Sequence, residues 1–247
     1  MGREPSVASA QASTVAKVKL PREQDPRNPN KRLAAFFDPD TVELITADDD
    51  SGILAAIGRV EGQPVVAFSS DATVQGGAMG VAGCKAILVA YERALADGVP
   101  VVGIWHSGGA RLAEGVVSLH AVGEVFAIMT RASGKVPQIS IVIGAAAGGA
   151  AYGPALTDIV ILGPEGRVFV TGPDVVRSVT GEAVDALRLG GPEPHGRRSG
   201  VAHVTTPDDE SALATARQLA ALLGRQGRLS PADLPEEYDL SALLPAE

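Results

Sequence analysis

Cysteine is nearly absent from this chain of 247 residues, and Cys84 is the only one. A single thiol excludes a disulfide framework and any zinc site built on several cysteines, and it suits a reducing compartment such as the cytoplasm. Aromatic residues make up 4% of the sequence and the net charge is −8, so neither a base-stacking platform nor a basic surface for nucleic acid is expected. The four histidines lack metal-ligand spacing, so no metal is expected either.

Several familiar catalytic signatures are also missing. The sequence has no phosphate-binding Gly-x-x-x-x-Gly-Lys-Ser/Thr loop, and no Gly-x-Gly-x-x-Gly follows a predicted strand. Ser107 does not stand in a Gly-x-Ser-x-Gly elbow. The longest uncharged run, residues 136–157, reaches the length of a membrane helix but contains Pro137, Pro154 and several glycines. A buried strand that leads into a helix explains this run better, so no membrane partner is expected.

Glycine, by contrast, is abundant at 29 of 247 residues, and one glycine motif is repeated. Strands are expected at 65–68, 101–105 and 139–143, and each is followed by a Gly-Gly-Ala turn: Gly76-Gly77-Ala78, Gly108-Gly109-Ala110 and Gly148-Gly149-Ala150. Apolar residues at helical spacing then run from Val81 to Gly98 and from Leu112 to Gly134. Strands that alternate with helices in this way predict an α/β fold with a largely parallel sheet.

The chain divides into three predicted parts. Residues 1–30 are polar and rich in proline, and we interpret them as a flexible N-terminal arm, either disordered or loosely docked. Residues 31–228 form the globular lobe, and residues 229–247 are typical of a linker toward a further lobe. Within the globular lobe, the patterns also predict strands at 42–45, 53–60, 159–162, 168–170 and 200–205, and helices that open near Thr171 and Thr206. The strand at 53–60 is expected to form a hairpin with the strand at 65–68, which then extends over 64–69.

The repeated turns suggest chemistry performed by the backbone. A Gly-Gly-Ala turn at a helix N-terminus presents unpaired N–H groups, and the helix dipole adds positive potential there. The turns at 108–110 and 148–150 could therefore direct N–H donors at one oxygen atom, which is the arrangement of an oxyanion hole. The alternative is that the small residues only permit tight packing of strand on helix. The pattern alone leaves both interpretations open.

Longer motifs around the turns follow one another in a distinctive order, at residues 76–80, 106–115, 136–140, 147–158, 169–176 and 189–191. Through them the segment from about Asp50 to Leu223 closely resembles the N-terminal carboxyltransferase lobe of biotin-dependent acyl-CoA carboxylase β-subunits, most of all the actinobacterial acetyl-/propionyl-CoA type. The resemblance implies a crotonase/ClpP-like ββα superhelix. It also implies transfer of CO2 from carboxybiotin to acetyl-CoA or propionyl-CoA, which gives malonyl-CoA or methylmalonyl-CoA.

The resemblance assigns roles to particular residues. It implies that Gly148, Gly149 and Ala150 hold the thioester oxygen, with Gly109 and Ala110 where related folds place a second donor. Further acyl-CoA contacts are expected from Gly108, Arg111, Gly76, Gly77 and Tyr152. Arg111 could face a CoA phosphate, although an ordinary salt bridge explains it equally well. In this family the biotin is thought to accept the substrate proton, which agrees with the lack of a recognisable general base.

The implied partners are a biotin carrier with its biotin carboxylase subunit and further copies of the chain, in a dimer-based oligomer that is a hexamer in full-length members. Two departures stand out: the second lobe, which supplies the biotin side, is missing here, and so is the four-cysteine zinc ribbon of the bacterial split form. The chain is therefore expected to need that lobe or a partner chain for activity. Two alternatives remain: a malonyl-thioester decarboxylase subunit and a non-catalytic CoA-binding assembly module.

Overall fold

The computed structural model describes residues 21–224, and the described strands form one mixed sheet. Its members, in chain order, are β1 (Glu43–Leu44), β2 (Ile53–Val60), β3 (Gln63–Ser70), β4 (Val101–Ser107), β5 (Gln138–Ala147), β6 (Ile159–Leu162), β7 (Arg167–Phe169) and β8 (Val204–Thr205). The antiparallel β1, β2 and β3 stand at one side, and β3, β4, β5, β6 and β8 continue in parallel. This confirms the predicted α/β fold with a largely parallel sheet.

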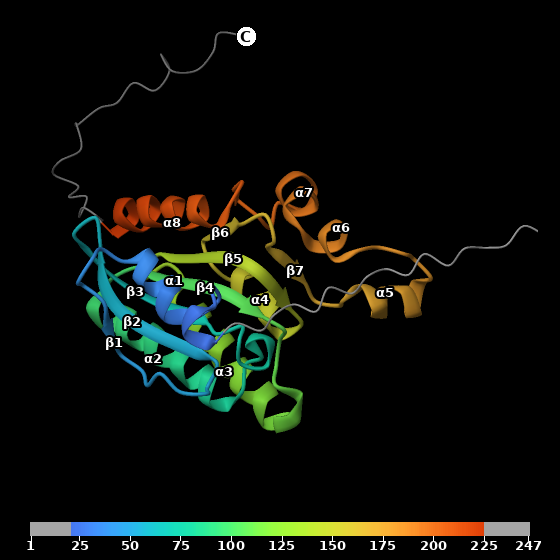
Figure 1. Cartoon of the computed structure of the whole chain (residues 1–247), viewed down its shortest axis with the longest axis horizontal. Coiled ribbons are helices and arrows are strands. Elements are labelled where there is room, and N and C mark those ends of the chain that lie inside the picture. The colour runs from blue at the N-terminus through green and yellow to red at the C-terminus, as the bar shows by residue number, and fades with distance from the viewer. Residues whose placement is uncertain (1–20, 225–247) are drawn as a thin grey trace, which may run out of the picture.

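Helices cover both faces of this sheet (Figure 1). The α-helices are α1 (Pro29–Phe36), α2 (Val81–Asp97), α3 (Val116–Ala132), α4 (Gly149–Ala155), α5 (Pro173–Thr180), α6 (Ala186–Gly190), α7 (Pro192–Pro194) and α8 (Asp209–Gly224). Shorter helical turns are η1 (Arg22–Gln24), η2 (Gln75–Gly77), η3 (Leu112–Glu114) and η4 (His195–Ser199). α1 and α8 lie on one face of the sheet, and α2, α3 and α4 lie on the other.

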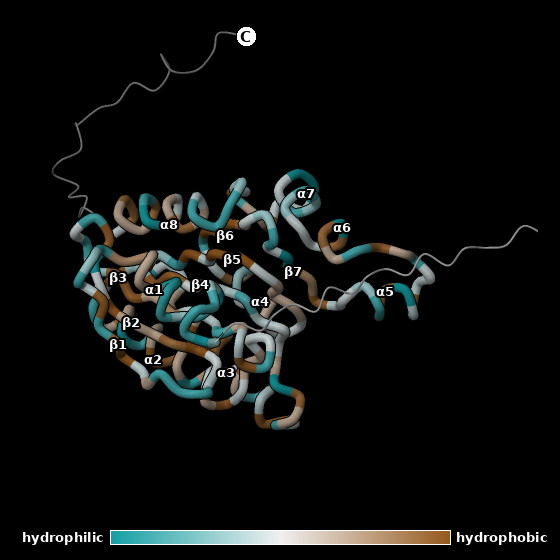
Figure 2. The backbone as a smooth tube through the Cα atoms, in the orientation of Figure 1, coloured by the Kyte–Doolittle hydropathy of each residue, from teal (hydrophilic) through white to brown (hydrophobic). Residues whose placement is uncertain are grey.

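Each face has its own apolar core, and Figure 2 shows the brown, hydrophobic residues concentrated in the central strands. One core joins the sheet to α2 and α3 through Trp105, Ile87 and Met129, which are almost fully buried. The other joins it to α1 and α8 through Leu33 and Ile141. Because strand side chains alternate between faces, a strand with a helix layer on both sides is expected to be largely apolar, as β4 and β5 are over most of their length.

A bulge in β5 changes the strand with which β5 pairs. Trp105 of β4 pairs with Val142 of β5, whereas Ser107 pairs with Ala146, so β5 carries two extra residues across this step. The first half of β5 pairs with β6 and its last residues, Ala145–Ala147, pair with β7. The bulge thus bends β5 away from one neighbour toward another just before the turn at Gly148.

The N-terminal arm needs a correction over residues 21–30. This stretch is docked: the Arg22 guanidinium bonds to Asp71 at 2.8 Å and to Asp48 at 2.7 Å. The Asn28 side chain caps α1 by accepting the N–H of Asn30. Its polar composition, which suggested an arm, instead supplies ion pairs and a helix cap. Residues 1–20, and the predicted linker at 229–247, lie outside the described residues.

Two helix starts and one strand also differ from their predictions. The helix predicted from Leu112 begins at Val116, because a separate helical turn intervenes and leaves Leu112 85% exposed. The helix predicted from Thr206 begins at Asp209, with the Asp208 carboxylate accepting the N–H of Ser211 as the cap. The last strand, predicted over 200–205, is limited to β8. Across residues 21–224, no helix is both long enough and apolar enough to cross a membrane.

Candidate active site at three glycine turns

The three Gly-Gly-Ala turns meet at the carboxyl ends of β3, β4 and β5. The first two are joined by the Gly108 N–H, which donates to the Gly76 carbonyl at 3.1 Å, and by the Met79 N–H, which donates to the Gly109 carbonyl at 2.8 Å. Gly77 lies so close to β4 that a Cβ there would overlap the carbonyl oxygen of His106. Only a residue without a side chain permits this approach. In parallel sheets this end is where ligands usually bind.

The second and third turns also lie against each other. A Cβ built on Gly109, whose φ is +104°, would come within 2.8 Å of the Ala147 carbonyl oxygen and 3.7 Å of the Gly149 nitrogen. Two turns that are forty residues apart in the sequence are therefore neighbours in the fold. This is the juxtaposition that an oxyanion hole with donors from both turns requires.

The hydrogen bonds of the turns decide which N–H groups remain without an acceptor inside the protein. The N–H of Gly109 donates to Ser107 Oγ at 3.2 Å, and that of Gly148 donates to the Phe169 carbonyl at 3.1 Å. With Gly108 already bonded to Gly76, these three amides are engaged inside the protein. Among residues 21–224, the N–H groups of Ala110, Gly149 and Ala150 have no acceptor. Of the five residues predicted as catalytic, these three are therefore the ones with an unbonded N–H, and Ala150 is itself fully buried.

The helix dipole contributes less than the sequence suggested. α3 begins at Val116, well after the turn at 108–110, so that turn is not at a helix N-terminus. α4 does begin at Gly149, but it has only seven residues. At the first turn, the N-terminus of α2 is closed by the Glu114 carboxylate, which accepts the Val81 N–H at 2.8 Å. The Ala110 amide is thus not part of a helix end, whereas the amides of Gly149 and Ala150 are the first two of the short helix α4.

Arg111 faces inward in this structure. Its guanidinium bonds to the Ser51 carbonyl at 3.1 Å and pairs with Glu114 at 3.4 Å, and its side chain is 13% exposed. Its Nε is buried without a partner among the described residues. These contacts fit the salt-bridge interpretation, and the CoA contact stays a prediction.

The site opens onto the protein surface. Gly76 and Gly108 are exposed, and Tyr152, one turn along α4 from Gly149, is 48% exposed with its ring against Phe126. A side chain at position 149 would point toward α3, because a Cβ there would lie 3.3 Å from Val122.

The ionisable groups near the turns are not poised as catalytic bases. Burial, assisted by the charge of Arg32, lowers the pKa of His106 to about 4, so its imidazole is neutral at pH 7. Cys84 is buried on α2, and burial raises the pKa of its thiol to about 12, as suits a core residue. Within residues 21–224, no cluster of His, Cys, Asp and Glu side chains is placed to hold a metal ion.

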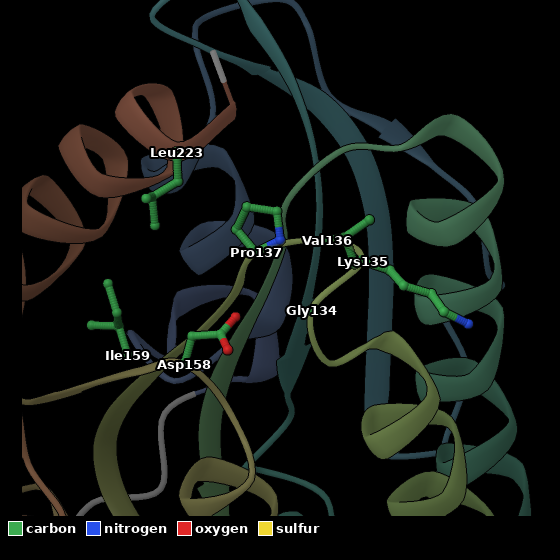
Figure 3. A pocket seen from close by; sticks show the side chains of 7 residues that line it. All are labelled: Gly134, Lys135, Val136, Pro137, Asp158, Ile159 and Leu223. Carbon is green, nitrogen blue, oxygen red and sulfur yellow. The ribbon is translucent and has the colours of Figure 1, made fainter. Parts of the chain in front are cut away.

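A cleft of about 270 Å³ lies at the opposite end of the strands (Figure 3). Its lining includes Pro137 and Asp158, which directly precede β5 and β6. The Asp158 carboxylate accepts the Gln138 N–H at 2.8 Å, and Lys135 points away from the cleft. The cleft therefore belongs to the far edge of the sheet and not to the glycine turns.

Two residues that matter to the site were not identified from the sequence. Ser107, set aside because it lacks a nucleophile elbow, is fully buried and its Oγ holds the Gly109 amide. Its place two residues before Gly109 was the available signal, since serine hydroxyls often accept N–H groups two residues on. Arg32 lies on α1 and touches His106, and nothing in its sequence context indicated this contact.

The family-level comparison matches the carboxyl transferase domain over residues 34–245. Among curated proteins, the propionyl-CoA carboxylase beta chain of Rhodococcus erythropolis is 58% identical over 224 residues, which cover 90% of this chain and 47% of that protein. A biotin-dependent acetyl-/propionyl-coenzyme A carboxylase beta6 subunit from Mycobacterium bovis is also 58% identical, with the same shares covered. The chain thus spans about half the length of the curated relatives it matches.

Solved structures agree on the fold. Transcarboxylase 12S, described as a hexamer with methylmalonyl-coenzyme A bound, superposes with a TM-score of 0.75 at 37% identity, covering 77% of this chain and 40% of that one. One chain of a malonate decarboxylase hetero-dimer from Pseudomonas gives a TM-score of 0.70 at 25% identity, covering 81% of this chain and 89% of that one. The predicted crotonase-like fold is confirmed by these neighbours.

Proposed function

The chain belongs to the carboxyl transferase family, and from this premise we propose that it is the acyl-CoA-binding lobe of an acyl-CoA carboxylase. The activity of the whole enzyme would be transfer of CO2 from carboxybiotin to acetyl-CoA or propionyl-CoA. The observation that carries the proposal is the contact between the second and third glycine turns, which places the free amides of Ala110, Gly149 and Ala150 at one end of the sheet.

The chemistry of this lobe is stabilisation of an enolate. Removal of a proton from the α-carbon of an acyl-CoA moves negative charge onto the thioester oxygen. Backbone N–H groups fixed by the fold bind that charge without having to reorganise during the reaction. Mutational removal of one such donor from an oxyanion hole costs about 10²–10³ in kcat in other enzymes. In this lobe we assign the donor role to Gly149 and Ala150, with Ala110 completing the site.

The remaining parts of the reaction belong to partners. Carboxybiotin on a separate carrier would supply the carboxyl group, and the biotin-binding side would come from a second lobe in a dimer-based oligomer. The neutral, inward-facing His106 supports this division, because its Nδ1 accepts from Arg32 and is not free to take a substrate proton. The finer assignments, production of malonyl-CoA for fatty acid synthesis and a cytoplasmic location, are part of the same proposal.

Binding by the 247-residue chain tests the proposal first. Isothermal titration with propionyl-CoA, acetyl-CoA and free CoA should give tighter binding for the esters than for CoA, because only the esters present a thioester oxygen. Equal affinity for all three, or no binding, would contradict the oxyanion assignment. Transfer activity is then measured with a chain that supplies the second half, together with the biotinylated carrier and its carboxylase.

A matched pair of variants at Gly149 isolates the N–H group. Gly149→Ala and Gly149→Pro both add a Cβ that lies about 3.3 Å from Val122, but only proline removes the amide hydrogen. Because Gly149 is the first residue of α4, proline is compatible with the helix. We expect the alanine variant of the completed enzyme to retain most of its kcat and the proline variant to lose about 100-fold. Equal losses would show that steric pressure on α3 matters and the donor does not.

A decarboxylase subunit is the second candidate, favoured by the likeness to one chain of the malonate decarboxylase hetero-dimer, which this chain covers almost completely. The same amides would stabilise the enolate left when a malonyl thioester loses CO2. Loss of CO2 from a malonyl thioester without a biotin carrier would favour this candidate. CoA binding without turnover, even after the second half is supplied, would favour the non-catalytic assembly module.

A further inference from the structure

A buried arginine connects the N-terminal helix to the candidate site. Arg32 of α1 is only 6% exposed, yet it has no carboxylate within 4 Å among the described residues. Its Nη1 donates to the Ser70 carbonyl at 3.3 Å, and its Nη2 lies 3.2 Å from Nδ1 of His106. These two residues stand at the carboxyl ends of β3 and β4. A buried charge is costly unless it is hydrogen-bonded, and these two bonds reduce that cost. They also tie α1 to this edge of the sheet.

The contact with His106 defines the state of the imidazole. An arginine can only donate, so Nδ1 must accept and the neutral ring must carry its proton on Nε2. The charged groups that face this ring are Arg32, Arg27, Arg167 and Asp25, and burial together with the three arginines outweighs Asp25. The imidazole therefore stays neutral over the ordinary pH range.

The ring of His106 occupies the bulge of β5. A Cβ on Gly144 would overlap the imidazole, so the ring lies directly on the β5 backbone between the pairs Trp105–Val142 and Ser107–Ala146. Beyond the bulge the two strands pair once more, Ser107 with Ala146, before each runs into its glycine turn. The position of the ring therefore influences how far apart the two turns lie.

We propose that Arg32 is a positioning residue: through the imidazole of His106 it holds the bulge in β5, and so fixes the separation of the glycine turns at 108–110 and 148–150. Its importance for catalysis rests on the function proposed above. Its structural part is independent of that function, because it concerns the turns themselves. The proposal requires that loss of Arg32 disturbs both turns although α1 contributes no atom to them.

Three variants of the 247-residue chain test this. Arg32→Met removes both hydrogen bonds, and Arg32→Lys retains the charge but has no planar fork with which to reach both acceptors. Arg217→Met is the matched control, because Arg217 of α8 bonds to the Phe36 carbonyl and to Asp38, and so anchors α1 without touching His106. Each variant is followed by the amide resonances of Gly109 and Gly149, the NMR titration of the His106 ring, and the Kd for propionyl-CoA at pH 7.5 and 5.5.

In Arg32→Met we expect both glycine amide resonances to move and the pKa of His106 to rise part of the way from about 4 toward 6.5, because burial, the larger cause of the lowered pKa, remains. The Kd for propionyl-CoA should increase at least fivefold at pH 7.5, and further at pH 5.5, where the ring begins to protonate. Arg32→Lys should fall between this variant and the wild type. Arg217→Met should lower stability while all three readouts stay at their wild-type values.

The proposal is overturned if Arg32→Met behaves as Arg217→Met does, with lower stability but unmoved glycine resonances and an unchanged pH dependence of binding. If Arg32→Met does not fold, Arg32→Lys decides by the same readouts. If the wild type does not bind propionyl-CoA, the proposed function fails, and the glycine resonances and the His106 titration still decide whether Arg32 positions the turns.

Discussion

The turns at 108–110 and 148–150 share one sequence, Gly-Gly-Ala, but the protein uses them differently. The turn at 108–110 is held on several sides: its two glycine amides donate to Gly76 and Ser107, and the Gly109 carbonyl accepts from Met79. It leaves only the N–H of Ala110 without an acceptor among the described residues. The turn at 148–150 donates one hydrogen bond, from Gly148 to Phe169, and leaves two adjacent amides, Gly149 and Ala150, unbonded at the start of α4.

This difference teaches that a motif identifies where backbone donors can stand but not which donors remain available. The turn at 108–110 is a support whose position depends on its neighbours. The turn at 148–150 supplies two of the three N–H groups that have no acceptor. Variants that loosen the support should therefore lower stability, whereas variants that remove a donor from the turn at 148–150 should lower activity. The following predictions test that contrast, from the largest expected effect to the smallest.

Gly77→Ala should have the largest effect on stability. Its Cβ would overlap the His106 carbonyl, and its φ of +75° is unfavourable for alanine, so we expect a loss of more than about 3 kcal/mol in the free energy of unfolding. Gly76→Ala is the matched control, because its φ of +65° is similar but the space around it is open, and it should cost about 1 kcal/mol. Urea denaturation measures both costs, and equal values would contradict the close packing of Gly77 against His106 of β4.

Ser107→Ala should have the next largest effect. It leaves the buried N–H of Gly109 without its acceptor, and an unsatisfied buried donor costs about 1–3 kcal/mol. The hydrogen exchange of the Gly109 amide should accelerate in the variant, whereas that of Gly148, which bonds to a main-chain carbonyl, should not change. A variant as stable as the wild type would show that the hydroxyl does not support the turn.

The dependence of stability on pH distinguishes the turns at 108–110 and 148–150. The ionisable His106 precedes the turn at 108–110, whereas only alanines, Ala145–Ala147, directly precede the turn at 148–150. Burial and Arg32 lower the pKa of His106 to about 4, against about 6.5 in the unfolded chain. Between these values the unfolded state binds the extra proton, so the free energy of unfolding should decrease as pH falls, by about 2 kcal/mol over the window.

His106→Asn is the control for that titration, since it offers Arg32 an oxygen acceptor but has no ionisable ring. The slope of stability against pH between 6.5 and 4 should decrease in this variant. The same slope in both proteins would mean that other groups titrate in this window and that His106 does not.

Gly108→Ala should have the smallest effect. Its Cβ would lie 3.7 Å from the Gly76 carbonyl oxygen, an ordinary contact, so the cost should be below about 0.5 kcal/mol. Gly109→Ala, one residue further, would bring its Cβ within 2.8 Å of the Ala147 carbonyl oxygen at a φ of +104°, and should cost several times more. Similar melting temperatures for the two variants would contradict the contact between the second and third turns.

Much of the fold could be predicted because its signals are local. The alternation of buried strands, glycine turns and helices correctly predicted β2, β3, β4, β6 and α2, each within about two residues. The docking of residues 21–30 could not be predicted, since it depends on ion pairs with Asp48 and Asp71, far along the chain. The late start of α3 was missed because Leu112 fits the helical period although it is exposed.

The site divides in the same way. Sequence patterns identified the residues of all three turns, and their convergence follows from the parallel order of β3, β4 and β5. The available donors could not be predicted, because they depend on which amides are already bonded to Phe169, Gly76 or Ser107. The bulge in β5 and its contact with His106 are likewise properties of packing, and no periodicity in the sequence indicated them.

The most direct test of the central claim, that main-chain amides of the glycine turns bind the thioester oxygen, is an NMR titration of the isotopically labelled chain with propionyl-CoA and with free CoA. We predict that the ester moves the amide proton resonances of Ala110, Gly149 and Ala150 well beyond any change that free CoA produces, because only the ester has a thioester carbonyl oxygen that can accept from them. Identical changes with both ligands, or amides that do not respond to the ester, would contradict the account.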